Sequence, residues 1–175
     1  MLDFLTLFLI AVSLSMDTFS LSTIYGTIGL EKRKIYLLSL IVGIFHFFMP
    51  LFGNLIGNFL LSKLTIQPNI VVGIIFILIA IQMFIQKEDV VDLKNFWMLL
   101  LFAFTVSIDS FSVGIGISMI TKNSIVAYLI FFVTSMIFTF FGLRFGKYLS
   151  AKFGNKATKI GAIILITLGI FYIFK

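Results

Sequence analysis

Cysteine is absent from this 175-residue chain, and histidine occurs once, as His46. Neither a disulfide framework nor a thiolate metal site can form, so a bound cation has to be held by oxygen atoms, with imidazole or thioether as possible additions. Charge is also scarce, because 11% of the residues are charged, against about 25% in soluble domains. The phosphate-binding motif GxxxxGK[ST] does not occur, which excludes ATP hydrolysis through that motif.

The chain is rich in apolar residues. They make up 61% of the chain, and the mean hydropathy is +1.19. A soluble domain is only about 45–50% apolar, so most of this surface is expected to face lipid. A chain of 175 residues has room for about six helices of roughly 20 residues, the length that crosses a bilayer. We therefore predict an all-α membrane protein in which residues 1–175 form a single membrane domain.

Charged and turn-forming residues interrupt the apolar sequence and mark the expected helix ends. A proline opens one of the segments, and it suits the first turn of a helix, where an N–H has no partner to lose. The six expected transmembrane helices are Phe4–Ile24, Ile35–Leu61, Pro68–Gln86, Phe96–Met119, Ser124–Leu149 and Lys159–Phe174.

Lysine and arginine are distributed unevenly over the expected loops. Ten of them fall on the side of the first, third and fifth loops, and three on the opposite side. The positive-inside rule places the richer side in the cytoplasm and both termini outside. The net charge of +6 is spread over short loops, which argues against nucleic acid as a partner and favours contacts with the lipid bilayer.

The two halves of the chain resemble each other. Asp17 and Asp109 lie 92 positions apart, in the similar motifs Ser15-Met16-Asp17-Thr18-Phe19-Ser20 and Ser107-Ile108-Asp109-Ser110-Phe111-Ser112. The motif Phe52-Gly53-x-x-x-Gly57 recurs 89 positions later as Phe141-Gly142-x-x-x-Gly146. We predict two repeats, 1–86 and 95–175. With three helices in each, the halves insert in opposite orientations, a recurrent plan of secondary transporters.

An aspartate within a membrane span is costly and usually functional. Helical spacing places Ser13 and Ser20 on the face of Asp17, and Thr105 and Ser112 on the face of Asp109. If the two faces meet near the middle of the bilayer, they offer two carboxylates and four hydroxyls to one hydrated divalent cation, such as Mn²⁺ or Mg²⁺. The alternative is a buried polar clamp that joins the halves through carboxyl–hydroxyl hydrogen bonds.

Small residues next to each aspartate are expected to serve packing. They form a second row on each of the two helices: Ser15, Thr18 and Ser22 on one, Ser107, Ser110 and Gly114 on the other. The two GxxxG motifs are likewise expected at close helix crossings.

His46 is a further candidate ligand. It lies one turn before Pro50, whose missing N–H leaves the carbonyl of His46 without its helical partner. The imidazole is able to ligate a cation or relay protons. The alternative is a neutral histidine that is hydrogen-bonded between helices.

At three of these motifs the chain resembles the manganese efflux pump (MntP) family. They are Ser15–Phe19, Met49-Pro50-Leu51-x-Gly53-x-x-x-Gly57 and Ser107-Ile108-Asp109-Ser110-x-x-Val113-Gly114. The resemblance implies a six-helix protein of the bacterial plasma membrane that exports Mn²⁺. It also implies that Asp17 and Asp109 are the central acids and that the residue at position 46 assists them. Sporulation-associated relatives share the motif set.

We therefore expect a secondary active exporter of a divalent cation, with Mn²⁺ as the transported substrate and no resident cofactor. Protons are the expected counter-ion, and the sequence leaves the oligomeric state open. The alternative is a structural or sporulation-associated accessory membrane protein that does not transport metal. An intramembrane aspartyl protease would also use two membrane aspartates. The two motifs are too alike for separate acid and base roles, so no enzymatic activity is expected.

Overall fold

The computed structural model describes residues 4–61, 67–85, 93, 95–118, 125–149 and 154–174. Every regular element among these residues is an α-helix, which confirms the predicted all-α class. The elements are α1 (Phe4–Thr27), α2 (Lys32–Leu61), α3 (Pro68–Ile85), α4 (Phe96–Thr105), α5 (Ile108–Ser118), α6 (Ile125–Leu149) and α7 (Gly154–Ile173).

The expected helix Phe96–Met119 is not continuous. Helix α4 ends at Thr105, and α5 begins at Ile108 with its axis bent by 40°. In the turn between them, the N–H groups of Val106 and Ser107 donate to the carbonyls of Phe102 and Phe104 at 3.0 and 3.2 Å. The shortened spacing of the second bond tightens the chain and ends the α-helical ladder. Sequence periodicity missed this break because the apolar residues continue through it.

Several helices have the length and composition of membrane spans. Four of them, α1, α2, α6 and α7, are long and apolar enough to cross a bilayer, and the bent α4–α5 pair adds a fifth if it is one span. Helix α3 is apolar over Asn69–Ile85 but falls short of that length. The chain is therefore a multi-pass membrane protein, and the sixth span stays a prediction.

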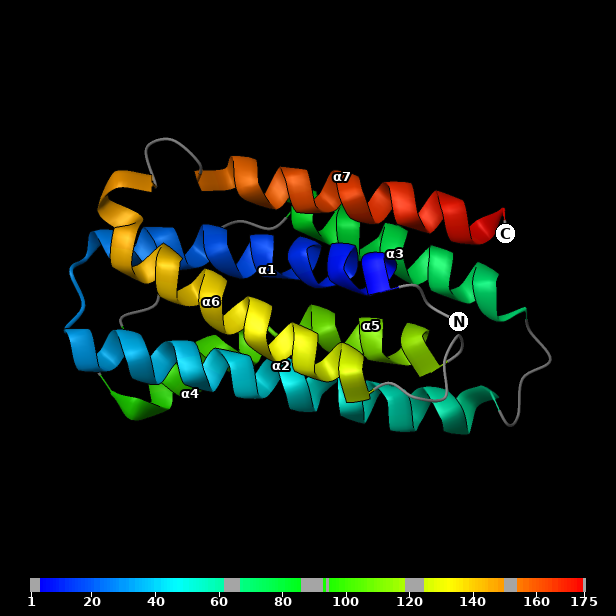
Figure 1. Ribbon diagram of the computed structural model, residues 1–175, viewed down its shortest axis with the longest axis horizontal. Helices are drawn as coiled ribbons and strands as arrows, with labels where there is room; N and C mark the ends of the chain where they lie inside the picture. Colours follow the sequence, from blue (N-terminus) through cyan, green and yellow to red (C-terminus); the bar gives the residue numbers. More distant parts are fainter. Residues whose placement is uncertain are drawn as a thin grey trace.

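The helices pack mainly across the two halves of the chain (Figure 1). Helix α1 lies against α6, α2 against α5 and α6, and α3 against α7. Successive spans alternate in direction along the bundle, so α1 and the α4–α5 pair run opposite ways. Oppositely inserted halves require this course, although the repeat itself stays a prediction.

Glycines permit the closest crossings. A Cβ on Gly142 of α6 would lie 2.6 Å from the Cβ of Ser22 and 3.0 Å from the carbonyl oxygen of Phe19. A Cβ on Gly53 of α2 would collide with the carbonyl oxygen of Phe111. Gly53 and Gly142 hold the same place in the two glycine motifs, as Phe19 and Phe111 do in the two aspartate motifs. The predicted close crossings are thus confirmed, and they join each half to the other.

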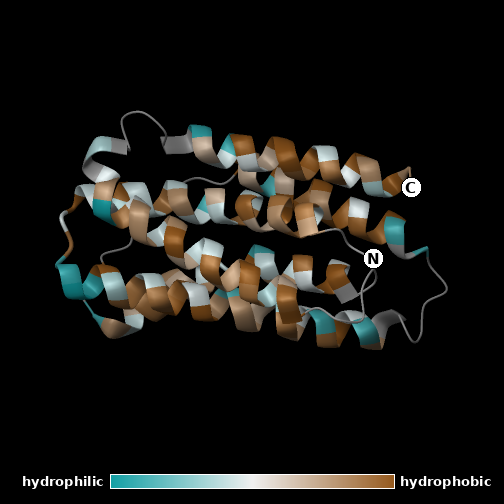
Figure 2. Ribbon diagram, viewed as in Figure 1, coloured by the Kyte–Doolittle hydropathy of each residue, from teal (hydrophilic) through white to brown (hydrophobic). Residues whose placement is uncertain are grey.

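The exterior is largely apolar. Figure 2 shows brown, hydrophobic residues along most of each helix and teal, hydrophilic residues mainly toward the helix ends. Large side chains such as Phe48 on α2, Leu78 on α3 and Ile163 on α7 are exposed at the surface. On a soluble protein such a surface would drive aggregation, whereas here it is suited to the acyl chains of a bilayer.

Candidate metal site

Two carboxylates from the two halves of the chain line one small cavity between α1, α3 and the α4–α5 pair, and two further lining residues, Gln82 and Thr105, are exposed. Asp17 projects from α1 and Asp109 from the first turn of α5, and both are buried. The two side chains are close enough to interact electrostatically. The remaining lining residues are Ile79, Gln82, Met83, Thr105 and Val106. The volume of ≈ 10 Å³ is about that of one water-sized sphere, so the cavity is small.

The break between α4 and α5 determines the surroundings of Asp109. Unpaired N–H groups and the helix dipole favour negative charge in the first turn of a helix, where Asp109 lies. Its Oδ1 accepts a hydrogen bond from the backbone N–H of Ser110 at 2.7 Å. Its Oδ2 is buried, and no donor in the described part of the chain reaches it. A buried carboxylate oxygen without a donor is costly unless something else satisfies it, and a cation would do so.

Of the four hydroxyl residues expected as ligands, the structure places one at the cavity. Thr105 lines the cavity and donates its proton to the carbonyl of Leu101 at 2.8 Å, so its oxygen keeps lone pairs for a cation. The lining does not include Ser13, Ser20 or Ser112. Ser13 is buried and donates to the carbonyl of Leu9 at 2.7 Å, within its own helix.

The structure places His46 in a different environment from the two aspartates. Its Nδ1 lies 2.9 Å from the carbonyl oxygen of Val42 and must carry a proton there, because a carbonyl only accepts. In the neutral ring, Nε2 is then an acceptor, and the hydroxyl of Thr18 lies 3.4 Å from it. No group of three His, Asp or Glu side chains within the described ranges is arranged to hold a metal. His46 therefore joins α2 to α1 without completing a three-ligand cluster.

The second row of small residues lies at helix contacts, as its spacing predicts. Ser15, Thr18, Ser22, Ser107 and Ser110 are all fully buried at helix contacts. The hydroxyls of Ser15 and Ser135 lie 3.2 Å apart and tie α1 to α6. On α5, a Cβ on Gly114 would collide with the backbone of Pro50, so the bare glycine lets α5 approach α2 at the proline. These residues position the aspartate-bearing helices.

Gln82 is a cavity residue that the sequence reasoning missed. It lies on α3, is exposed, and lines the cavity together with the two aspartates and Thr105. Its signal was available, because it is the single polar side chain between Asn69 and Gln86 in an otherwise apolar helix. Gly73 and Gly161 correspond to each other in the last helix of each predicted repeat, 88 positions apart, and at that spacing Gln82 corresponds to the apolar Ile170. Comparison of the two halves of the sequence therefore did not identify Gln82 as a candidate.

The sequence matches known proteins along most of its length. A family model described as "Putative manganese efflux pump" matches residues 29–173. The chain belongs to the manganese efflux pump (MntP) family. It is 38% identical over 176 residues to a protein of Bacillus pumilus (strain SAFR-032) named "Putative manganese efflux pump MntP", with 98% of this chain and 96% of that protein covered.

Proteins with the same name from two further bacteria are similar over nearly their whole length. The protein of Geobacillus thermodenitrificans (strain NG80-2) is 32% identical, with 99% of this chain and 97% of the relative covered. The protein of Bacillus cereus (strain B4264) is 33% identical, with 96% and 94% covered. No solved structure matches this member of the MntP family.

Proposed function

We propose that this protein exports Mn²⁺ across the bacterial plasma membrane and that Asp17 and Asp109 both coordinate the transported ion. The observation that carries the proposal is the single cavity lined by one carboxylate from each half, with one carboxylate oxygen unpaired. Two carboxylates neutralise a dication, which lowers the cost of moving it through the bilayer. The choice of manganese follows from the names of the relatives.

Oxygen atoms from four helices are available to complete the coordination. The two carboxylates come from α1 and α5, the hydroxyl of Thr105 from α4, and the amide oxygen of Gln82 from α3. Backbone carbonyls at the end of α4 add further acceptors, because the last turn of a helix lacks intrahelical partners. An oxygen ligand set of this kind suits Mn²⁺, Mg²⁺ or Ca²⁺ and disfavours softer metals.

The test replaces each central carboxylate by an amide of the same shape. Asp17→Asn and Asp109→Asn are expressed in a manganese-sensitive, export-deficient bacterial host, and growth in added Mn²⁺ and cellular manganese are measured. Removing one partner from a buried charged assembly costs about 3–5 kcal/mol, so we expect at least a roughly 100-fold loss of ion affinity and no rescue of growth. The matched control is Glu31→Gln, the same change at an exposed position at the end of the bundle.

Export that persists in both asparagine variants, at expression equal to the parent, would reject the assignment. Failure of the parent protein itself to rescue growth would favour the alternative of an accessory membrane protein without metal transport. Titration of the purified protein with Mn²⁺, followed by its thermal unfolding, separates loss of binding from loss of folding, because an ion that binds the native state raises its stability.

We further propose that protons return in exchange for the metal. When Mn²⁺ leaves, two protons on Asp17 and Asp109 restore neutrality in the cavity, so that charge is balanced in both states. The measurement uses vesicles that contain the protein and a pH-sensitive dye, with Mn²⁺ added on one side. Manganese movement that is unaffected by a protonophore would reject the coupling but leave the export assignment intact.

The basic end of the bundle is proposed to face the cytoplasm. Lys32, Arg33 and Lys34 open α2, Arg144 lies near the end of α6, and Lys156 and Lys159 lie near the start of α7. Figure 1 places these three helix ends at the same end of the bundle. The positive-inside rule then puts both termini on the outer side.

A further inference from the structure

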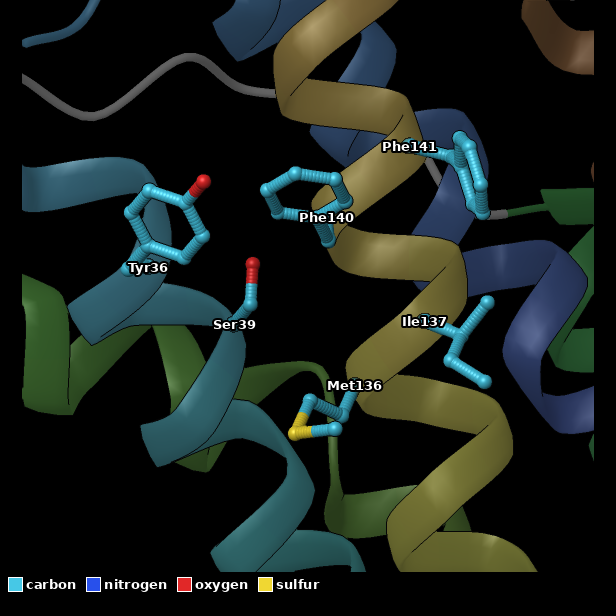
Figure 3. A pocket seen from close by; sticks show the side chains of 6 residues that line it. All are labelled: Tyr36, Ser39, Met136, Ile137, Phe140 and Phe141. Carbon is cyan, nitrogen blue, oxygen red and sulfur yellow. The ribbon is translucent and has the colours of Figure 1, made fainter. Parts of the chain in front are cut away.

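A crevice opens between α2 and α6 on the outside of the bundle (Figure 3). It has a volume of ≈ 230 Å³, and its lining residues are Tyr36 and Ser39 of α2 and Met136, Ile137, Phe140 and Phe141 of α6. The lining is apolar apart from two hydroxyls, and the hydroxyl of Ser39 donates to the carbonyl of Ile35 at 2.8 Å. None of these residues lines the cavity of Asp17 and Asp109. The crevice is therefore a separate feature, suited to a hydrocarbon chain.

A charged pocket adjoins the crevice. It has a volume of ≈ 120 Å³ and shares Tyr36 and Phe140 with the crevice, while Lys32 and Arg144 supply its charge. The rings of Tyr36 and Phe140 pack 5.3 Å apart where the two meet. Within the described ranges the acids are Glu31, Asp17 and Asp109, and the last two line the other cavity. At this end of the bundle the described residues therefore set one carboxylate, Glu31, beside the two positive charges of Lys32 and Arg144.

We propose that the crevice and the charged pocket together form a binding site for an anionic phospholipid. Lys32 and Arg144 bind the phosphate of the headgroup, and an acyl chain lies along Met136, Ile137 and Phe141. A guanidinium matches the geometry of a phosphate through paired N–H donors, and basic pockets between transmembrane helices are known sites for acidic headgroups. A free phosphate would leave the apolar crevice unused, which is why the occupant is a lipid.

The location suggests what the lipid does. Helices α2 and α6 come from different halves of the chain, and each contributes one basic residue to the pocket, Lys32 from α2 and Arg144 from α6. One phosphate between them replaces repulsion between two cations with two attractive contacts. The bound lipid therefore stabilises the contact between the halves at the basic end of the bundle.

The test measures thermal unfolding of the purified full chain in detergent, titrated with phosphatidylglycerol, with phosphatidylethanolamine of the same acyl chains, or with inorganic phosphate. We expect phosphatidylglycerol to raise the melting temperature selectively. In Lys32→Gln/Arg144→Gln its apparent affinity should fall about 30-fold, equivalent to about 2 kcal/mol for the loss of two cationic groups near the headgroup. The matched control Lys156→Gln/Lys159→Gln removes the same charge from exposed residues at the same end and should keep the parent affinity.

Three results would overturn the proposal. Equal shifts with phosphatidylglycerol and phosphatidylethanolamine would show ordinary lipid solvation, and an equal shift with inorganic phosphate would show a simple anion site. Equal losses in the two double variants would show a general effect of charge. If the first double variant does not fold, Lys32→Arg and Arg144→Lys, which keep the charge, must retain the preference for phosphatidylglycerol. Loss of lipid binding would leave the assignment of Asp17 and Asp109 untouched, because the two sites share no residue.

Discussion

The close crossing between α1 and α6 predicts how much one added methyl group lowers the stability of the protein. In Gly142→Ala the new Cβ would lie 2.6 Å from the Cβ of Ser22, whereas carbon atoms pack at about 3.5–4.0 Å. The two helices therefore have to separate by about 1 Å, and overpacking of this kind costs about 1–3 kcal/mol. Alanine recovers up to about 1 kcal/mol through its higher helix propensity. With that full gain subtracted, the net loss is up to about 2 kcal/mol, which for a chain of this size lowers the melting temperature by up to about 8 °C.

The assay is thermal unfolding of the purified protein in one detergent, with Gly116→Ala as the matched control. Gly116 is also a buried helical glycine, but a Cβ added there would lie 3.6 Å from its nearest neighbour, a methyl carbon of Val72, which is an ordinary contact. The control should unfold at or slightly above the parent temperature. If Gly142→Ala is as stable as Gly116→Ala, the close crossing is not what holds α1 against α6. Gly53→Ala, at the equivalent place in the other half, should be destabilised in the same way.

Four further variants test the roles of Gln82 and His46 and the orientation of the chain in the membrane. Gln82→Leu should weaken Mn²⁺ binding about 10- to 100-fold, the value of one interaction with a charged group, and unchanged binding would remove Gln82 from the site. His46→Leu leaves the hydroxyl of Thr18 buried without its partner and should cost about 1–3 kcal/mol of stability, with Mn²⁺ affinity in the folded protein within about twofold of the parent. An affinity loss as large as that of Asp109→Asn would instead make His46 a ligand. Because the chain has no cysteine, single cysteines report topology: a membrane-impermeant maleimide added to intact cells should label Ile125→Cys and spare Ile28→Cys, and the reverse pattern would invert the orientation.

Local patterns in the sequence predicted much of this protein. Mean hydropathy and the spacing of charged residues predicted an all-α membrane protein, because a bilayer tolerates only segments that satisfy their own backbone hydrogen bonds. The motifs around Asp17 and Asp109 pointed to two acids that line one cavity in the structure, because an ionisable residue in an apolar helix is conspicuous. The glycine motifs predicted close crossings, and Gly53 and Gly142 lie at such crossings.

Other features depend on contacts between distant segments. The helix breaks at Val106 and Ser107, where the sequence has neither proline nor glycine. This break places Asp109 in the first turn of a new helix. Ser13 has the helical spacing of a ligand but bonds to Leu9 in its own helix. Spacing along one helix indicates which residues share a face, and it does not say what that face meets.

The sequence by itself determined the solvent of this protein and its helical class, and it singled out two acids within apolar helices, because each follows from the chemistry of neighbouring residues. Only the tertiary structure decided which oxygens gather around those acids. It brought Gln82 to the cavity, set His46 beside Thr18, and placed Lys32 and Arg144 in one pocket beside an apolar crevice. The physical reason is that each of these contacts joins different helices, and their distances are set by how closely glycine and serine let those helices approach.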